Sequence, residues 1–397
     1  MKKVILRVLL GMLGIVLVVS GVIGILYLSG RNKMKNEVLA GEDIGAIGGF
    51  EEPIQTTTDL PVVSFDENGD IVIQSEDGSV PIDEVSAKAD GQMPENEVES
   101  GSVVPADIVT VSDNEDGVVS YKGQRYRYND DLVTILVMGI DKNSEVTAAA
   151  HGADGGQADA IFLLLLDGSS GQINIVTINR NTMAQVDIYN RSGSYFGQGL
   201  MQLTLQHSYG DGMGLSNERM AEAVSRMFHN IPIHAYASLN MAGIVPLNDA
   251  VGGVTLTPIM DIPGTSIKQG QSINLMGKDA YDYVHWRDWQ HEFASADKRL
   301  EREKQYLAVF GKKVQSQIKA DPAVVTRLYS TVQKYLVTDL SLDRITYLAA
   351  EAGGYHFDSG NIYSVPGTTT MGFSYEEYHV DEEGLRDLII RLFFKQI

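Results

Sequence analysis

The sequence contains no cysteine, and this absence excludes several classes of protein. Without thiols, the chain cannot be a disulfide-stabilised scaffold, hold a thiolate zinc centre or use a cysteine nucleophile. Positive charge is also scarce, because 31 Lys and Arg residues stand against 52 Asp and Glu residues, a formal charge of −21. A nucleic-acid-binding protein needs a basic surface, so we expect no nucleic-acid partner.

The acidic excess lies mainly in one stretch. Residues 36–118 contain 21 acidic residues and a single basic residue, Lys88. Residues 1–35 contain six basic residues and no acidic one, and residues 119–397 have the mixed charges of an ordinary globular domain. The sequence therefore predicts three parts with different physical properties.

Residues 8–28 form an uncharged, apolar run of 21 residues. At about 1.5 Å per residue, a helix of this length spans about 32 Å, enough to cross a hydrocarbon core of about 30 Å. The run is longer than the apolar region of a cleaved signal peptide and ends in Tyr27 and Leu28, not at a small-residue cleavage site. We predict an uncleaved anchor in the cell membrane, with a cytoplasmic stub at residues 1–7 and the remainder outside the cytoplasm.

The acidic stretch at residues 36–118 is rich in Asp, Glu, Gly, Ser and Val and has no helical period. This composition is typical of a flexible linker or of short isolated strands. We expect it to hold an exported domain, residues 119–397, away from an anionic membrane surface.

Three apolar runs in this domain, at residues 133–140, 160–166 and 172–179, predict β-strands. Strands without polar alternation are buried on both faces. We therefore predict an α/β fold, a three-layer α/β/α sandwich around a mixed central sheet. The short turn at 167–171 makes the second and third strands antiparallel and places position 159 opposite position 179.

Three charged residues stand at the ends of these strands. If the first strand is also antiparallel to the second, Asp141, Asp159 and Arg180 meet at one edge of the sheet. Two carboxylates and a guanidinium suit a hard cation together with a phosphate. The alternative is an ion pair that only caps the end of the sheet.

Residues 296–318 predict a long amphipathic helix. Arg299 and Arg302 lie on one side of its first turns, where basic residues oppose the helix dipole unless an anion is bound. The alternative is a solvent-exposed pair between Arg299 and Glu303. Trp286, which precedes this helix, could stack on a sugar, cover an isoprenoid or belong to a small core.

Six motifs resemble the LytR–CpsA–Psr family in their order and spacing, over about residues 130–312. They are VTILVMGID (133–141), QADAIFLLLLD (157–167), VTINRNT (176–182), LQHSYGDG (205–212), NDAVGGV (248–254) and YVHWRD with DKRLEREKQYL (283–307); the tail at 365–385 looks like that of clostridial-type members. The resemblance implies a Mg²⁺-dependent phosphotransferase on the extracellular side of a Gram-positive cell membrane. Such an enzyme moves a glycopolymer from an undecaprenyl-pyrophosphate carrier to peptidoglycan.

The resemblance also implies roles for individual residues. By position, it assigns Mg²⁺ to Asp141 and Asp159, and the grip on the pyrophosphate to Arg180, Arg287, Arg299 and Arg302. Asp297 resembles the carboxylate that would activate the accepting hydroxyl, although its spacing to Arg299 is shifted by one residue. Gln157, His285 and Trp286 would line the bound substrate.

Four positions depart from the family's pattern. Gln157 and His285 stand where arginine is common, Asn181 where aspartate is common, and Glu303 where glutamine is common. Two fewer guanidiniums and one more carboxylate weaken the grip on an anion. Two alternatives to the transferase therefore stay open: a non-catalytic polyprenyl-lipid or envelope-polymer binding protein of the regulatory, "transcriptional attenuator" type, and a pyrophosphate hydrolase that uses water at the same site.

Overall fold

The computed structural model describes residues 26–41, 62–65, 71–75, 78–81, 117–149, 154–190, 192–288 and 292–397. The predicted stub, residues 8–25 of the predicted anchor and most of the acidic stretch lie outside these ranges. Among the helices within them, none is both long and apolar enough to cross a membrane.

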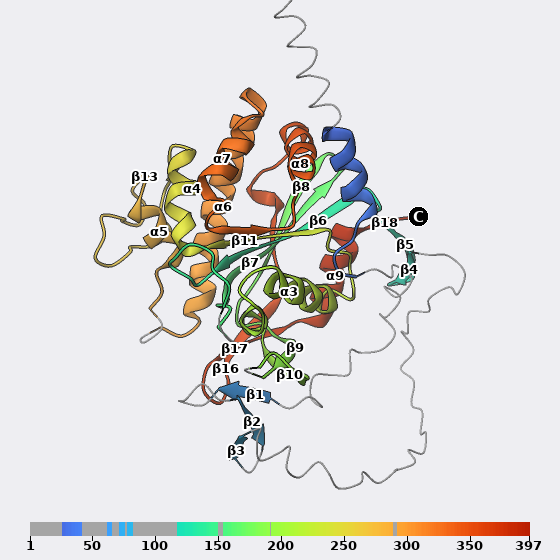
Figure 1. Cartoon of the computed structure of the whole chain (residues 1–397), viewed down its shortest axis with the longest axis vertical. Helices are drawn as coiled ribbons and strands as arrows, with labels where there is room; N and C mark the ends of the chain where they lie inside the picture. The colour runs from blue at the N-terminus through green and yellow to red at the C-terminus, as the bar shows by residue number, and fades with distance from the viewer. Residues whose placement is uncertain are drawn as a thin grey trace, which may run out of the picture.

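A six-stranded mixed sheet forms the centre of the domain (Figure 1), in the order β14-β11-β6-β7-β8-β15. Its strands are β6 (Leu132–Ile140), β7 (Ala158–Asp167), β8 (Gln172–Ile178), β11 (Ala235–Asn240), β14 (Leu336–Thr338) and β15 (Ile362–Ser364). The three predicted strands are β6, β7 and β8, and each neighbouring pair is antiparallel. Because β11 runs parallel to β6 and β15 parallel to β8, the prediction of a mixed central sheet is confirmed.

The register of β7 and β8 differs by one residue from the prediction. Asp167 pairs with Gln172, and continuing this ladder places position 159 opposite position 180 instead of 179. Asp167 stays in the strand because its carboxylate accepts hydrogen bonds from the side chains of the two serines in the following turn. The turn is therefore one residue shorter than predicted.

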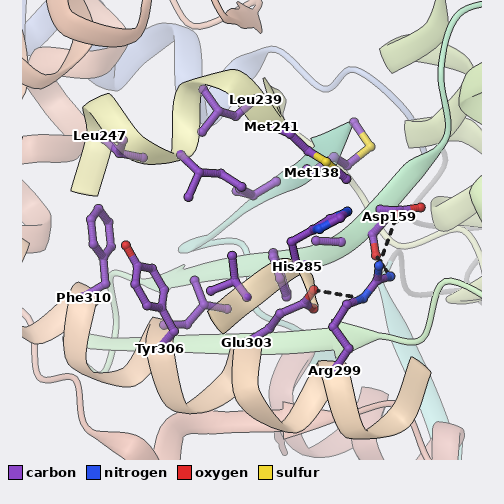
Figure 2. A pocket seen from close by; sticks show the side chains of 17 residues that line it. Met138, Asp159, Leu239, Met241, Leu247, His285, Arg299, Glu303, Tyr306 and Phe310 are labelled. Carbon is purple, nitrogen blue, oxygen red and sulfur yellow. Dashed lines mark hydrogen bonds and ion pairs between the residues drawn. The ribbon is translucent and has the colours of Figure 1, made fainter. Parts of the chain in front are cut away.

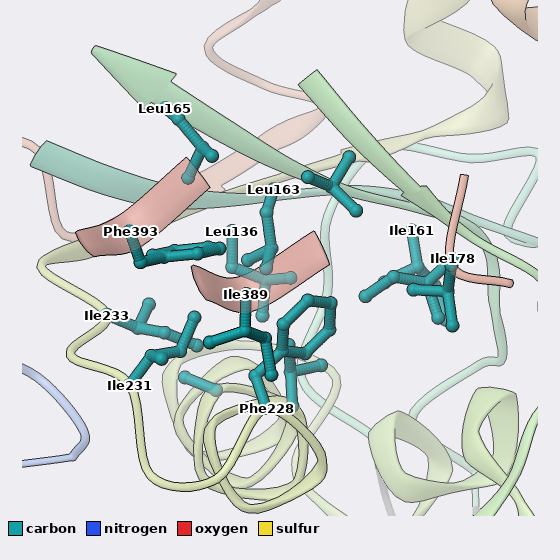
Figure 3. Close-up of a cluster of buried hydrophobic side chains, with 14 of the residues drawn as sticks. Leu136, Ile161, Leu163, Leu165, Ile178, Phe228, Ile231, Ile233, Ile389 and Phe393 are labelled. Atoms are coloured by element: carbon teal, nitrogen blue, oxygen red, sulfur yellow. The ribbon is translucent and has the colours of Figure 1, made fainter. Parts of the chain in front are cut away.

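Helices cover both faces of the central sheet. On one face, Leu163 of β7 joins α3 (Gly214–Met227) and α9 (Glu382–Phe393) in the largest buried cluster, shown in Figure 3. On the other face, Phe162 packs with residues of α6 (Ser295–Ala320), beside α8 (Leu342–Gly354). Neighbouring residues of a strand point to opposite faces, so burial on both faces explains the unbroken apolar run of β7.

Smaller elements surround this core. Among the described residues they are the strands β1 (Val62–Phe65), β2 (Ile71–Ser75), β3 (Gly78–Pro81), β4 (Val118–Tyr121), β5 (Gln124–Tyr128), β9 (Met183–Tyr189), β10 (Tyr195–Gln202), β12 (Val254–Leu256), β13 (Ile273–Leu275), β16 (Gly367–Met371), β17 (Glu376–Val380) and β18 (Phe394–Gln396). The helical elements are η3 (Leu203–Tyr209), η4 (Met241–Gly243), α4 (Ile244–Ala250), α5 (Lys278–His285), α7 (Val324–Val332) and η5 (Ser359–Asn361). The β16–β17 hairpin and α5 matter most here, because both border the candidate site.

Residues 26–41 pack against the domain. Residues 26–36 are helical and lie beside α8 (Figure 1), where Met34 is fully buried. Lys33 forms an ion pair with Asp343 at 2.9 Å, and Ala40 pairs in antiparallel fashion with Ile233, just before β11. The chain therefore joins the domain before most of the acidic stretch, again where β1 pairs in parallel with β10, and once more at β4.

Candidate active site

The central sheet brings Asp141, Asp159 and Arg180 together at one edge. Asp141 directly follows β6, Asp159 is the second residue of β7, and Arg180 lies two residues beyond β8. Arg180 donates from Nη1 to the Asp159 carboxylate and from Nη2 to Oε1 of Gln157. The backbone N–H of Gln157 donates to Oδ1 of Asp141 at 2.7 Å, so one connected network holds all four residues.

Arg299 reaches this network from the first turns of α6. It donates from Nη1 to Oδ2 of Asp159 at 2.9 Å and from Nη2 to the main-chain oxygen of Asp159 at 2.8 Å. Its Nε lies 3.4 Å from Oε1 of Glu303. Both side chains are buried, with Arg299 only 5% and Glu303 only 8% exposed. The alternative of a solvent-exposed surface pair is therefore wrong, because the pair forms inside the site.

Burial and charge shift the carboxyl groups of the network in different directions. Burial alone would raise the pKa of Asp159, but Arg180 and Arg299 reverse this effect and hold it below its usual value. Burial, together with repulsion from Asp159, raises the pKa of Asp141. Burial also raises the pKa of Glu303 to about 7, against the opposing charge of Arg299. Two of the three carboxyl groups thus hold protons more tightly than usual.

The oxygen ligands of Asp141 and Asp159 are of the kind that Mg²⁺ prefers. In the part of the chain that the structure describes, no group of three or more metal-ligating side chains forms a complete site. Mg²⁺ needs only one or two carboxylates when phosphate and water complete its shell. Burial is the main cause of the raised pKa of Asp141, and repulsion from Asp159 adds to it; a bound cation would relieve both effects. Asp141 and Asp159 therefore fit a magnesium ion that arrives with a phosphorylated ligand.

Arg180 keeps an unused hydrogen-bond donor. Its Nε is buried and has no hydrogen-bond partner among the described residues. A buried donor without a partner is unfavourable, and an anion in the site would satisfy it. Arg180 is thus organised by Asp159 and Gln157 on one side and remains available to a ligand on the other.

An apolar cavity of about 240 Å³ opens next to Asp159 and Arg299 (Figure 2). Side chains from β6, β7, α4, α5 and α6 line it, including Val137, Met138, Leu247, Tyr306, Leu307 and Phe310. The polar residues Asp159, His285, Arg299 and Glu303 also line it, and Figure 2 shows Asp159 and Arg299 at the end away from Phe310. The cavity can hold an apolar chain whose head group is an anion.

His285 lies in the wall of this cavity. It is the last residue of α5, and its ring packs on Tyr281 with 4.8 Å between ring centroids. Burial lowers the pKa of His285, and the charge of Arg299 lowers it further. The imidazole is therefore neutral at pH 7, and it adds no positive charge to the site of the free protein.

A second, polar cleft of about 310 Å³ lies on the Arg180 side of the network. Its described lining residues are Arg180, Asn181, Gln202, Arg287, Ser295, Met371, Ser374, Tyr375 and Glu376. Four of these come from the β16–β17 hairpin, far along the chain from the motifs. The resemblance of the tail at 365–385 covers these residues, but it assigned them no role, because only the fold brings the hairpin to the site.

Three of the predicted site residues lie outside the network and line neither the cavity nor the cleft. Arg302 is only 1% exposed and donates to the main-chain oxygens of Tyr283 and Trp286, so it caps the end of α5. The Trp286 ring lies 5.6 Å from the Arg302 guanidinium. Asp297 accepts hydrogen bonds from the side chains of Asn179 and Thr369, which tie α6 to β8 and β16.

Comparison with protein families gives one match that spans most of the chain. A model of the LytR_cpsA_psr family matches residues 99–392. Among curated proteins, the chain is similar to the polyisoprenyl-teichoic acid–peptidoglycan teichoic acid transferases TagU of three bacteria. It is 29% identical over 161 residues to TagU of Oceanobacillus iheyensis, which is 40% of this chain and 44% of the relative. It is 26% identical over 216 residues to TagU of Bacillus cereus, which is 53% of this chain and 62% of the relative. The third, from Enterococcus faecalis, is 28% identical over 273 residues (67% and 80%). The chain thus spans less than two thirds of the length of the first two relatives.

Solved structures show the same fold at low sequence identity. Protein gbs0355 from Streptococcus agalactiae superposes with a TM-score of 0.54 at 18% identity, over 66% of this chain and 86% of that protein. TagV of B. subtilis gives 0.51 at 20% identity, over 66% and 96%. The structure described as TagT bound to LI-WTA gives 0.50 at 19% identity, over 66% and 89%. These likenesses support the mixed α/β architecture.

Proposed function

Because the chain belongs to the LytR–CpsA–Psr family, we propose that it is a glycopolymer phosphotransferase. It would take the polymer from an undecaprenyl-pyrophosphate carrier and join it to peptidoglycan. One observation carries the proposal: the apolar cavity is also lined by the buried Arg299 and by the carboxyl groups of Asp159 and Glu303, and Arg180 pairs with the same Asp159. A polyprenyl pyrophosphate has the matching chemistry, an apolar chain joined to a strong anion. The teichoic acid transferases among the relatives support the same reaction class.

The arginines would bind the pyrophosphate of the donor. Arg180 offers its free Nε, Arg299 lies at the mouth of the cavity, and Arg287 faces the polar cleft beside Arg180. Charge-assisted bonds from guanidinium to phosphate are about twice as strong as neutral hydrogen bonds. The same groups would stabilise the charge that develops on the leaving phosphate, so they serve both binding and turnover.

Mg²⁺ would be held by Asp141 and Asp159, and when bound it neutralises charge on the pyrophosphate. Arg180 and Arg299 fix the Asp159 carboxylate in place. The backbone N–H of Gln157 fixes the Asp141 carboxylate in the same way. The chain itself therefore orients both carboxylates before any ligand arrives.

The predicted anchor at residues 8–28 would place this domain on the outer face of the cell membrane, where lipid-linked donor and peptidoglycan are both present. Residues 26–41 bind the domain through Met34 and the Ala40–Ile233 pairing. The docked segment overlaps the predicted anchor at residues 26–28, so the domain would begin at the end of the anchor. The acidic stretch would then leave the domain, contact it through the pairing of β1 with β10, and return to it at β4.

A binding protein is the second candidate, and the departures at the site favour it. Gln157 supplies a neutral amide to Arg180 where the family commonly has arginine, and His285 is neutral. Glu303 adds a carboxyl group beside Arg299. A site with less positive charge can retain a lipid pyrophosphate and still fail to stabilise the transition state, because turnover needs stronger interactions there.

Calorimetry on the full chain in detergent tests donor binding, with farnesyl pyrophosphate and inorganic pyrophosphate as ligands. Arg180→Ala and Arg299→Ala should each lower the binding affinity for both ligands about 10- to 100-fold. Leu247→Gln, in the lining of the apolar cavity, should lower the affinity for farnesyl pyrophosphate but not for inorganic pyrophosphate. Lys298→Ala is the control, because Lys298 is exposed and pairs with Glu292. If the arginine variants bind farnesyl pyrophosphate normally, the donor site lies elsewhere.

A further inference from the structure

We propose that the polar cleft beside Arg180 receives the acceptor, a sugar hydroxyl of a peptidoglycan strand, and that Glu376 takes the proton of that hydroxyl. This inference rests on the proposed transferase function. It adds the acceptor's place in the fold and a catalytic residue from the β16–β17 hairpin.

The Arg180–Asp159 ion pair separates the two openings of the site. Asp159 lines the apolar cavity, and Arg180 lines the polar cleft. A phosphate held by the arginines therefore has an apolar exit on one side and a polar one on the other. Phosphoryl transfer places the attacking and leaving oxygens roughly in line. If the lipid phosphate leaves toward the cavity, the acceptor enters from the cleft.

The lining of the cleft suits a sugar. Gln202, Ser295 and Ser374 offer hydrogen-bonding groups, and Tyr375 adds an aromatic ring. A few placed polar groups in a concave site are typical of a specific small-molecule site. Among the described residues that line this cleft, Glu376 is the only carboxylate.

Glu376 is held firmly, and one of its oxygens remains available. Oε1 accepts a hydrogen bond from the backbone N–H of Ala294 at 2.8 Å, where Ala294 has a left-handed backbone with φ 55°. The main-chain oxygen of Glu376 accepts from Nε2 of Gln202 at 2.7 Å. No described residue donates to Oε2, so this oxygen can accept a proton from a group in the cleft.

Asp297, which the family resemblance assigns to the activation of the acceptor, is occupied in this chain. Its two oxygens accept from Asn179 and from Thr369, respectively. Asp297 also lies outside the lining of the cleft. Among the described residues, Glu376 is the carboxylate that lines the cleft and keeps one oxygen without a donor.

The chemical step balances with these groups alone. The acceptor oxygen attacks the phosphorus that carries the glycopolymer, and a new O–P bond forms. The bond between that phosphorus and the bridging oxygen breaks, and polyprenyl phosphate leaves with the bonding electrons. The hydroxyl proton passes to Oε2 of Glu376, and no oxidant or reductant is required.

The test uses the full chain in detergent, a labelled disaccharide on farnesyl pyrophosphate as donor, and uncrosslinked peptidoglycan strands as acceptor. Glu376→Gln keeps an oxygen that can accept from Ala294 but cannot take a proton. We expect its turnover number to fall about 100- to 1000-fold, in the range of general-base loss, while donor affinity changes less than about twofold. Glu377→Gln is the matched control, because Glu377 is the next residue of β17 and pairs with His379 at 3.1 Å.

Rescue separates proton transfer from a structural role. Glu376→Ala should regain part of its turnover in formate, which supplies the missing carboxylate, and failure of rescue would overturn the assignment. Turnover of Glu376→Gln within threefold of wild type would also overturn it, as would a parallel loss of donor affinity. If the wild-type chain binds the donor and transfers nothing, the proposed function itself fails, and this outcome differs from transfer that is insensitive to Glu376.

Discussion

Glu303 provides a sharp test of the buried charge network. It lies in α6 beside Arg299, is only 8% exposed, and burial raises its pKa to about 7 from 4.5. The folded protein therefore binds a proton at Glu303 more tightly than the unfolded chain does. Stability contributed by this group is complete below pH 4.5 and is lost as the pH rises through 7, because the buried carboxylate must then ionise.

The expected size of this effect follows from the pKa shift. Each pKa unit corresponds to about 1.4 kcal/mol, so the shift of Glu303 costs about 3 kcal/mol once the group is fully ionised in both states. Glu303→Gln removes the ionisation and keeps nearly the same shape. The variant should therefore be about 3 kcal/mol more stable than wild type at pH 8 and nearly equal to it at pH 4.5.

Chemical denaturation of both proteins at several pH values between 4.5 and 8 measures this difference. Subtracting wild type from variant cancels the titration of all other groups. Glu301→Gln is the control on the same helix, because Glu301 is 58% exposed and pairs with Lys304. Its free energy of unfolding should differ from that of wild type by the same amount at every pH. If the difference in free energy of unfolding between Glu303→Gln and wild type is also independent of pH, the buried network as described is refuted.

Three further predictions follow from the same structure. His285→Arg should raise affinity for farnesyl pyrophosphate at pH 7.5 and flatten its pH dependence, because the wild-type imidazole is neutral until an anion draws a proton onto it; parallel binding curves for the two proteins would count against this. Arg302→Ala should lower the free energy of unfolding by about 2–4 kcal/mol, because two main-chain carbonyl oxygens lose their hydrogen-bond donor. Unchanged stability together with lost binding of farnesyl pyrophosphate would instead place Arg302 among the residues that bind the anion. Protease added to protoplasts should cut within residues 42–116 and leave residues 117–397 on the membrane until denaturant is added, because residues 26–41 stay docked; release without denaturant would contradict the docking.

The central sheet and part of the site were predictable from sequence for a simple physical reason. Strands that are buried on both faces produce unbroken apolar runs, and short connections force neighbouring strands to be antiparallel. These two facts bring Asp141, Asp159 and Arg180 to one edge, as the structure has them. The one-residue error in register arose because Asp167 pairs within the ladder and not in the turn.

Other features depended on contacts that no local pattern records. The helical period placed Arg299 and Arg302 on one side of α6, but it could not tell that the first meets Asp159 and the second the end of α5. Nor could composition reveal that Met34 is buried in the domain. Glu376 reaches the site only through the β16–β17 hairpin. Each case depends on long-range packing, which sequence periodicity does not encode.

The decisive measurement for the proposed transferase is the transfer of a labelled, polyprenyl-pyrophosphate-linked oligosaccharide to peptidoglycan by the full chain. We predict that label appears in peptidoglycan with one polyprenyl phosphate released for each transfer, and that Asp159→Ala abolishes both. Donor that binds without any transfer would identify a binding protein, and release of the label to water at the same rate with or without peptidoglycan would identify a hydrolase. Either result would contradict the assignment as a glycopolymer transferase.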